Sequence, residues 1–428
     1  MNNEVTKNDK AWKLLFDKYK ILDAIDTHGY FQIDAAQINE FREARLMTKF
    51  DHKANLPELF SKHNLAILPI TRGSYIISRF DAYKEIEPIN SQVTKVAFPE
   101  YLESINYESI TSESIALNCA YISNILSNFL EDDDLLPTVN GRMKSGCFSY
   151  FIKAKDTSVK VDVTNAQIEI DGGYEGRKKL ALIEAKNFIP DDFIIRQLYY
   201  PYRSWIDKVS KKVATVFMIY SNGKFSLYEY DFANINDYNS LFLIKKENYG
   251  IDIEKITLDD INNILLQVKV IQEPELPFPQ ADNFERVINL CELLLKSELT
   301  KDEITYKYAF DPRQTNYYTD AGRYLSLIEK YKKDGQIIFS LTLKGMEIVK
   351  SKYKARQLGF VKSIIEHEVF NETLKTYLKC QKMPSKDEIV DTMKRLKLYR
   401  VNSRSTYERR ASTVYSWVNW ILNLCKIN

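Results

Sequence analysis

Apolar residues recur every three or four positions near the start of the chain, over Trp12–Ile25 and again over Ala35–Met47. This spacing predicts two amphipathic helices. Two short apolar runs follow, Leu65–Ile70 and Ser74–Ser78, with a glycine turn between them that predicts a pair of strands. Helices followed by such a hairpin indicate a small winged-helix-like domain over residues 1–95.

The middle of the chain predicts an α/β domain over residues 96–270. Its first element is an amphipathic helix over Ser112–Leu130, and a second helix is expected over Asp191–Trp205, with two aspartates capping its first turn. Apolar and β-branched runs predict the strands of a mixed central sheet flanked by these helices. The expected strands are Cys147–Ala154, Val159–Val163, Gln167–Asp171, Lys179–Lys186, Val213–Tyr220 and Lys224–Tyr230.

Three prolines within Gln272–Gln280 exclude a regular element, so a linker is expected at 271–281. Beyond it, a helix, a short helix, an exposed helix and a wing strand predict a winged-helix DNA-binding domain over residues 282–355. A mainly helical DNA-binding domain over residues 356–428 ends the chain. The expected elements are Phe284–Lys296, Lys301–Phe310, Gln314–Lys330, Gly335–Thr342 and, near the end, Thr406–Leu422.

The amino-acid composition limits the location and the kinds of site that we expect for this protein. The 428 residues are 45% hydrophobic, and no apolar stretch is long enough for a membrane span or resembles a signal peptide, so we expect a cytoplasmic protein without a membrane partner. Five scattered cysteines and four histidines favour neither disulfides nor a zinc site. Residues 285–428 hold 27 Lys and Arg against 17 Asp and Glu, whereas the rest of the chain is acidic. This division suits a protein that grips phosphates with one part and holds a divalent metal with another.

The candidate chemistry lies on two predicted neighbouring strands. The first carries Glu169 and Asp171, and the second carries Glu184 and Lys186. Side chains alternate along a strand, so each pair shares a face, and adjacent strands could bring them to one point. The pair Gly172-Gly173 would let the chain leave the first strand sharply.

Phosphodiester hydrolysis needs such a cluster. Carboxylates are the ligands that Mg²⁺ prefers, and the metal lowers the pKa of its water and offsets phosphate charge. Asp171 and Glu184 fit that role, while Lys186 would orient the water or help deprotonate it and stabilise the transition state. Glu169 could support a second metal. A similar triplet at Asp51-His-Lys53 is set aside, because its surroundings are polar and show no strand pattern.

The order Gln-Ile-Glu-Ile-Asp followed by Glu-Ala-Lys resembles the PD-(D/E)xK nucleases, in particular type II restriction endonucleases. The resemblance covers roughly residues 105–265, and Ile170 stands where the family often has proline. It implies that Asp171, Glu184 and Lys186 are the metal-binding and catalytic residues. Gln197 falls where related nucleases place a glutamine beside the site, although a surface role is equally open.

Candidate DNA contacts fall into three groups. Arginine and glutamine can pair with base edges, and tyrosine, lysine and small hydroxyl residues at a helix start can hold phosphates. Alternatives stay open: the tyrosines of the exposed helix could be core residues, and the first group could be a plain glycine-rich loop. The groups are Arg142 and Lys144 in that loop; Arg313, Gln314, Tyr317 and Arg323 around the exposed helix; and Arg404, Arg409, Arg410 and Thr413 near the last helix.

The expected function is Mg²⁺-dependent cleavage of double-stranded DNA at a specific short sequence, in a prokaryotic cell. A homodimer is the simplest way to cut both strands, and a restriction enzyme implies a cognate DNA methyltransferase acting on the same site. Two alternatives remain: a structure-specific nuclease of DNA repair or recombination, and a DNA-binding regulator whose nuclease fold is only a scaffold. The intact Asp171, Glu184 and Lys186 argue against the scaffold.

Overall fold

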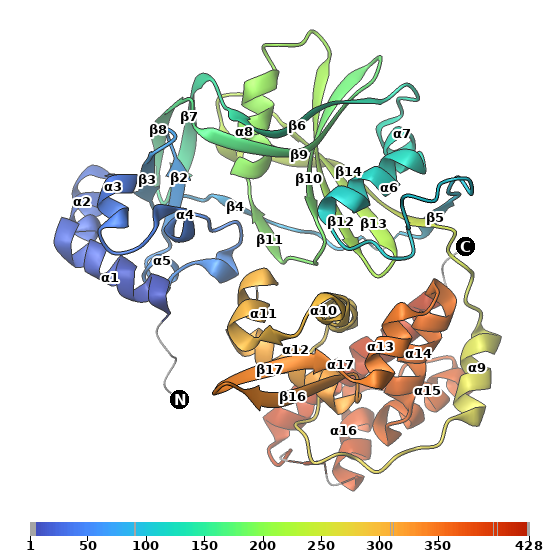
Figure 1. The fold of residues 1–428 in the computed structure, drawn as a ribbon. Coiled ribbons are helices and arrows are strands. Elements are labelled where there is room, and N and C mark those ends of the chain that lie inside the picture. Colours follow the sequence, from blue (N-terminus) through green and yellow to red (C-terminus); the bar gives the residue numbers. More distant parts are fainter. Residues whose placement is uncertain are drawn as a thin grey trace.

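The computed structural model describes residues 6–89, 91–308, 310, 312–396, 398–399 and 401–425. Its N-terminal part, the domain with the largest sheet and the C-terminal part follow one another along the chain and occupy separate regions of the molecule (Figure 1). The sheet domain is mixed α/β, with helices on both faces of its sheet.

The N-terminal part packs helices on a three-stranded antiparallel sheet in the order β1-β3-β2. Both predicted helices are interrupted, the first because Lys20 takes a left-handed conformation with φ 51°. Trp12 and Phe60 meet edge to face at the centre of this core. The elements are α1 (Lys7–Tyr19), α2 (Ile21–His28), β1 (Phe31–Asp34), α3 (Ala35–Asn39), α4 (Ala44–Met47), η1 (Lys53–Asn55), α5 (Glu58–Lys62), β2 (Ala66–Pro69) and β3 (Ser74–Ser78).

A seven-stranded mixed sheet forms the middle of the molecule, in the order β5-β14-β13-β12-β10-β9-β6. The pairs β10–β12 and β14–β5 are parallel, and the other neighbours are antiparallel. The strands are β5 (Val93–Val96), β6 (Leu136–Lys144), β9 (Gln167–Glu175), β10 (Lys179–Lys186), β12 (Lys212–Ser221), β13 (Lys224–Phe232) and β14 (Leu241–Ile251).

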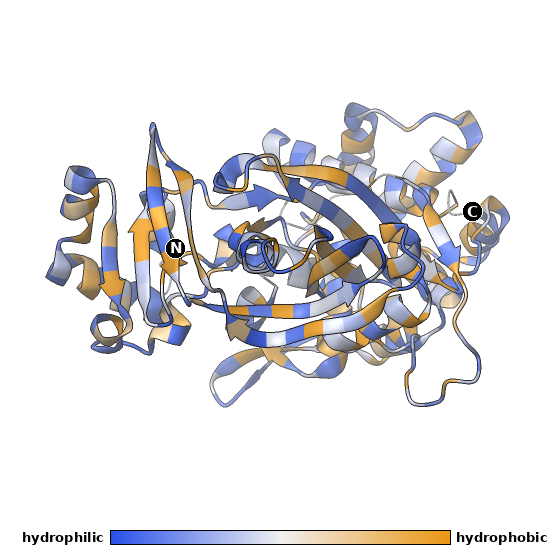
Figure 2. Ribbon diagram, turned by 90° about the horizontal axis from the view of Figure 1, so that it is seen from above, coloured by the Kyte–Doolittle hydropathy of each residue, from blue (hydrophilic) through white to orange (hydrophobic). Residues whose placement is uncertain are grey.

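Helices cover both faces of this sheet. Alternate residues of β10 divide between the two cores: Ala181 and Ile183 pack with α6 (Glu113–Ile122) and α7 (Ile125–Leu130), whereas Leu180 and Leu182 pack with α8 (Arg196–Trp205). Apolar and polar residues accordingly alternate along several strands in Figure 2. The helix predicted over Ser112–Leu130 is therefore two helices.

Two predictions in this domain are wrong in detail. β7 (Cys147–Ala154) and β8 (Thr157–Thr164) form a separate two-stranded sheet instead of joining the central one. The helix predicted from Asp191 begins only at Arg196, because residues 192–194 pair as β11 (Asp192–Ile194) with β4 (Tyr83–Glu85). Asp191 instead accepts hydrogen bonds from Arg286, so the two aspartates do not cap the helix.

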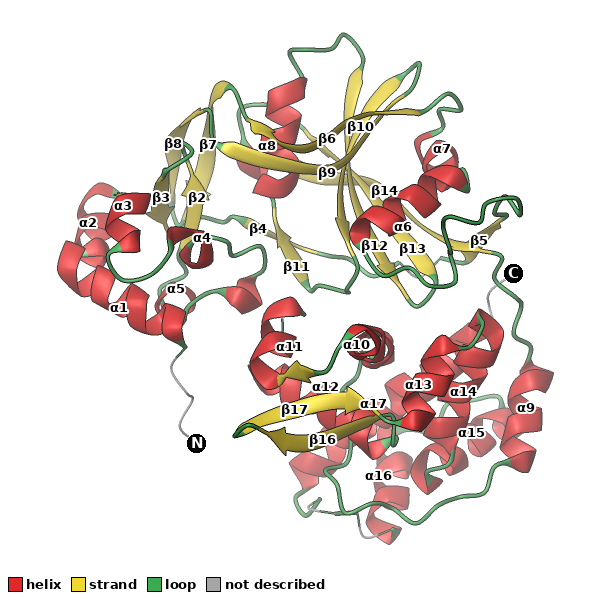
Figure 3. Cartoon of the chain, in the orientation of Figure 1, coloured by secondary structure: helices red, strands yellow, loops and turns green. Residues whose placement is uncertain are grey.

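The C-terminal part is mostly helical with one small sheet, as Figure 3 shows. Residues 271–283 contain neither helix nor strand. The helix predicted over Gln314–Lys330 ends at Tyr324, and the chain then continues into a strand. The elements are α9 (Leu258–Gln267), α10 (Phe284–Lys296), β15 (Leu299–Thr300), α11 (Lys301–Lys307), α12 (Pro312–Tyr324), β16 (Ile328–Lys333), β17 (Gln336–Leu341), α13 (Leu343–Lys350), α14 (Tyr353–Ile365), α15 (Glu368–Cys380), α16 (Lys386–Arg395) and α17 (Arg404–Leu424).

Polar contacts attach the C-terminal part to the turn between β12 and β13. Asn222 is fully buried there; its side chain exchanges hydrogen bonds with Gln357, and its backbone N–H donates to Glu292. Lys224 pairs with Glu285 at 2.5 Å. None of the helices that the structure describes is long and apolar enough to cross a membrane.

Candidate active site

The candidate catalytic residues meet where β9 and β10 stop pairing. The ladder between these strands ends at the pair Gly172↔Ile183. One residue further on, a carboxylate oxygen of Asp171 accepts the backbone N–H of Ala185 at 2.9 Å. Since this side chain takes the place of a backbone acceptor, it is fixed between the two strands and next to Glu184.

The paired glycines serve close packing and not a sharp exit from the strand. β9 continues past them to Glu175. A Cβ on Gly173 would lie 2.6 Å from the Cβ of Val139 on β6, and one on Gly172 would lie 3.3 Å from a methyl carbon of Leu117 on α6. The glycines therefore let β6 and α6 approach β9 beside the site.

Glu184 and Lys186 lie side by side on the face of β10 that meets α8. Both are nearly buried, with 9% and 8% of their surfaces exposed. The Lys186 ammonium donates to Glu184 Oε1, and the side-chain amide of Gln197 on α8 donates to the same oxygen. Gln197 Oε1 is buried and has no hydrogen-bond partner among the described residues. The structure thus places Gln197 at the site, where the sequence left its role open.

Burial shifts the protonation of this pair. It raises the pKa of Glu184 to about 7, an effect that Lys186 opposes and the nearby Asp171 charge reinforces. Burial alone would lower the pKa of Lys186, but the negative charges of Glu184, Glu113 and Asp171 outweigh it and raise that pKa. Lys186 therefore stays protonated at neutral pH, which suits charge stabilisation and orientation of water better than proton removal.

Two further acidic residues reach the site from distant parts of the sequence. Glu113, in the first turn of α6, has its pKa raised by burial, and the charges of Lys186 and Asp171 act on it in opposite directions. Asp51 is close enough to raise the pKa of Glu184, and its carboxylate lies 3.4 Å from the guanidinium of Arg196. No strand pattern marks either residue, so local spacing could not find them. The triplet beginning at Asp51, set aside on sequence, borders the site.

Glu169 lies on β9 but faces the neighbouring strand. Its carboxylate is 3.4 Å from the guanidinium of Arg142 on β6, and both side chains are at least half exposed. A small cavity next to it is lined by Glu169, Glu184 and Gln197. Residues 141–144 belong to strand β6 and do not form the glycine-rich loop that was considered for them. Lys144 is exposed at the end of this strand.

The residues predicted to contact DNA from α12 differ in exposure. Arg313 is exposed, Gln314 and Tyr317 are half-buried, and Arg323 lies 2.8 Å from Asp320. Tyr324, at the end of this helix, is buried in the C-terminal core, as a core role for the tyrosines would require, and so is the adjacent Leu325.

The start of α17 lies close to α12. Arg404 and Arg409 are exposed, and Arg410 is near enough to Tyr317 for the tyrosine to influence its pKa, which burial lowers. The second and third predicted groups thus adjoin. Thr413 does not belong to this surface: it is fully buried and donates a 2.5 Å hydrogen bond to Asp282.

The donors at the site fit a hard cation. Asp171 and Glu184 offer carboxylate oxygens. Gln197 Oε1 is a further buried oxygen, and it has no hydrogen-bond partner among the described residues. In the described ranges, no three His, Cys, Asp or Glu side chains are grouped to bind a metal ion. Mg²⁺ is commonly held by one or two carboxylates, with water and phosphate oxygens completing its coordination, so a pair suffices.

Family comparisons divide the chain into three segments. Residues 9–77 match a domain of unknown function (DUF6996), residues 78–250 match another (DUF6997), and residues 286–426 match a third (DUF7226). No curated protein and no solved structure shows significant similarity to the chain.

Proposed function

We propose that this protein is a Mg²⁺-dependent endonuclease of the type II restriction class, which hydrolyses double-stranded DNA at a specific short sequence. The observation that carries the proposal is the meeting of Asp171, Glu184 and Lys186 at the point where β9 and β10 separate. Two carboxylates and one permanent cation at a break in a sheet are suited to phosphodiester hydrolysis.

In this proposal Asp171 and Glu184 hold the metal. When bound, Mg²⁺ lowers the pKa of a water molecule and offsets charge on the phosphate. Asp171 is kept in place by the Ala185 N–H, and Gln197 fixes one oxygen of Glu184. Lys186, protonated beside Glu184, stabilises the charge that builds on the phosphate oxygens in the transition state.

In this proposal the basic C-terminal third of the chain binds the DNA. Arg410 on α17 lies near Tyr317 on α12, and the exposed Arg313 and Arg409 belong to the same two helices, which supports a shared DNA-binding surface. The order α10, α11, α12 and the hairpin β16–β17 is that of a winged helix, which supports a docking mode through α12. A homodimer is the simplest arrangement for cutting both strands, and a cognate methyltransferase would protect the host's own sites.

The test is digestion of unmethylated phage DNA with Mg²⁺, with an EDTA control. The native chain is compared with three nearly isosteric variants, Asp171→Asn, Glu184→Gln and Lys186→Met. Lys178→Ala is the matched control, since this lysine is exposed in the turn before β10. Circular dichroism of each variant checks folding, and a gel-shift assay without metal checks binding.

Discrete bands that the three site variants lose while still binding DNA would support the proposal. The expected loss is at least about 100-fold in cleavage rate, typical of removing a preorganised charge at an active site. A smear of fragments would indicate a structure-specific or unselective nuclease instead of a sequence-specific one. Binding without cleavage by the native chain, on both methylated and unmethylated DNA, would favour the regulator.

A further inference from the structure

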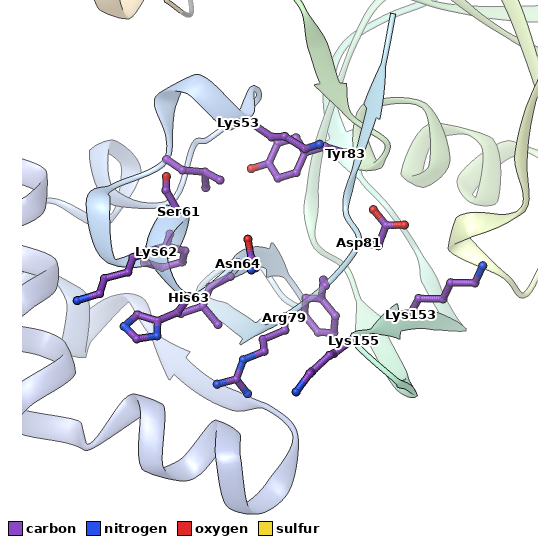
Figure 4. A pocket seen from close by; sticks show the side chains of 14 residues that line it. Lys53, Ser61, Lys62, His63, Asn64, Arg79, Asp81, Tyr83, Lys153 and Lys155 are labelled. Carbon is purple, nitrogen blue, oxygen red and sulfur yellow. The ribbon is translucent and has the colours of Figure 1, made fainter. Parts of the chain in front are cut away.

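A second concave site lies between the N-terminal part and the β7–β8 hairpin. Figure 4 shows it, with Lys53, Lys62 and His63 on one side and Lys153 and Lys155 on the other. Its volume is about 780 Å³, which is within the range of sites for small organic ligands. It shares no lining residue with the cavity at Glu184.

The rim of this pocket is strongly basic. Lys53, Lys62, Lys153 and Lys155 are exposed, and within the described part of the chain none of them lies within 4.0 Å of a carboxylate. Arg79, a further cationic residue at the rim, is paired with Asp26 at 2.7 Å, and one exposed carboxylate, Asp81, also lines the pocket, so the four lysines outnumber it. Because unpaired cations around a hollow concentrate positive potential there, the pocket attracts an anion.

The wall of the pocket is apolar. Leu56 is half-buried there and Phe80 and Tyr83 each expose less than a tenth of their surface, whereas Phe60 and Leu65 are buried in the N-terminal core. The Tyr83 hydroxyl donates to the carbonyl of Phe50, so this residue presents mainly its ring to the hollow. A small inorganic anion would leave the exposed parts of Leu56, Phe80 and Tyr83 uncovered, whereas a planar heterocycle would lie against them.

One short segment connects this pocket with the candidate active site. The charge of Asp51 raises the pKa of Glu184, the ring of the buried His52 packs against Phe188, and Lys53 lines the pocket. The Lys53 backbone N–H donates to Asp192, which fixes the segment to β11. A nucleic acid bound at the active site could therefore place a neighbouring unit at the pocket.

We propose that this pocket binds a nucleotide, with the phosphate among the lysines and the base against the apolar wall. The same chemistry is offered by a free mononucleotide and by one unit of a nucleic-acid strand. The proposal does not depend on catalysis, because it rests on the charge and shape of a separate site.

The experiment is a titration of the full chain in EDTA at low salt with four probes: dAMP, dTMP, inorganic phosphate and an eight-nucleotide single strand. Isothermal calorimetry gives affinity. Acetylation of lysines followed by mass spectrometry gives location, because a bound probe protects Lys53 and Lys155. The variant is Lys53→Ala with Lys155→Ala, which removes one cation from each side of the pocket (Figure 4). The control, Lys10→Ala with Lys160→Ala, removes the same charge from exposed positions outside it.

We expect nucleotide affinity to fall about tenfold in the pocket variant and to stay unchanged in the control. Protection of Lys53 and Lys155 by mononucleotides would assign a free nucleotide, and protection by the single strand alone would assign a nucleic-acid unit; both support the site. Phosphate binding as tight as that of mononucleotides would overturn it, since the wall would then contribute nothing. Lack of protection by every probe would also overturn it.

Discussion

The raised pKa of Glu184 predicts that metal binding depends strongly on pH. A carboxylate must be ionised to hold Mg²⁺, and burial brings the pKa of Glu184 to about 7. The ionised fraction is then about one in eleven at pH 6 and about ten in eleven at pH 8. Affinity rises with pH in this window because proton and metal compete for the same oxygens. The dissociation constant for Mg²⁺ should therefore be about tenfold higher at pH 6 than at pH 8.

Calorimetric titration of Mg²⁺ into the full chain at pH 6, 7 and 8, at constant ionic strength, measures this effect. Repeating it in buffers of different ionisation enthalpy counts the protons released, which should approach one at pH 6 and nearly vanish at pH 8. Glu184→Gln should remove both the binding and its pH dependence, while Asp134→Asn, an exposed carboxylate paired with Arg177, should change neither. Equal dissociation constants at pH 6 and pH 8 would refute the assignment of Glu184 as a metal ligand.

Three further predictions concern stability and DNA binding. Trp417→Ala should destabilise the chain by about 3–5 kcal/mol in chemical denaturation, because the ring is fully buried and its N–H donates to a backbone carbonyl; a loss below about 1 kcal/mol would contradict this packing. Asn222→Ala should lower the free energy of unfolding by about 1–3 kcal/mol, since Gln357 loses its buried partner; an unchanged free energy of unfolding in chemical denaturation would contradict this. Arg409→Ala should weaken DNA binding and lower the slope of log K against log salt by about 1, with Lys178→Ala as the unchanged reference; an unaltered slope would remove Arg409 from the interface.

The elements with the strongest patterns follow the sequence closely. β10 covers the predicted Lys179–Lys186, and α10 covers the predicted Phe284–Lys296. α10 has apolar residues at helical spacing, and β10 is a short continuous apolar run, as is typical of a strand buried on both faces. The neighbourhood of the site was predictable for the same reason: alternation along β10 sets Glu184 and Lys186 on one face.

The missed elements depend on contacts that local pattern does not contain. β14 carries lysines in its middle, and its place in the sheet is compatible with them because Lys245 pairs with Glu131 and Lys246 with Glu87. The break between α6 and α7 comes at Asn124, which takes a left-handed conformation with φ 61°. Asparagine tolerates that conformation but does not require it, so its position alone could not locate the break.

The charges at the candidate site favour the binding of a further cation. The negative charges of Glu184, Glu113 and Asp171 all act on the ammonium of Lys186, and burial raises the pKa of both glutamates, an effect that the Asp171 charge reinforces. Such an excess of carboxylates is costly without a further cation and becomes favourable with one. Asp171 is already held between the strands by the Ala185 N–H. A divalent ion would thus lower the pKa of both glutamates and relieve the repulsion that folding builds into the site.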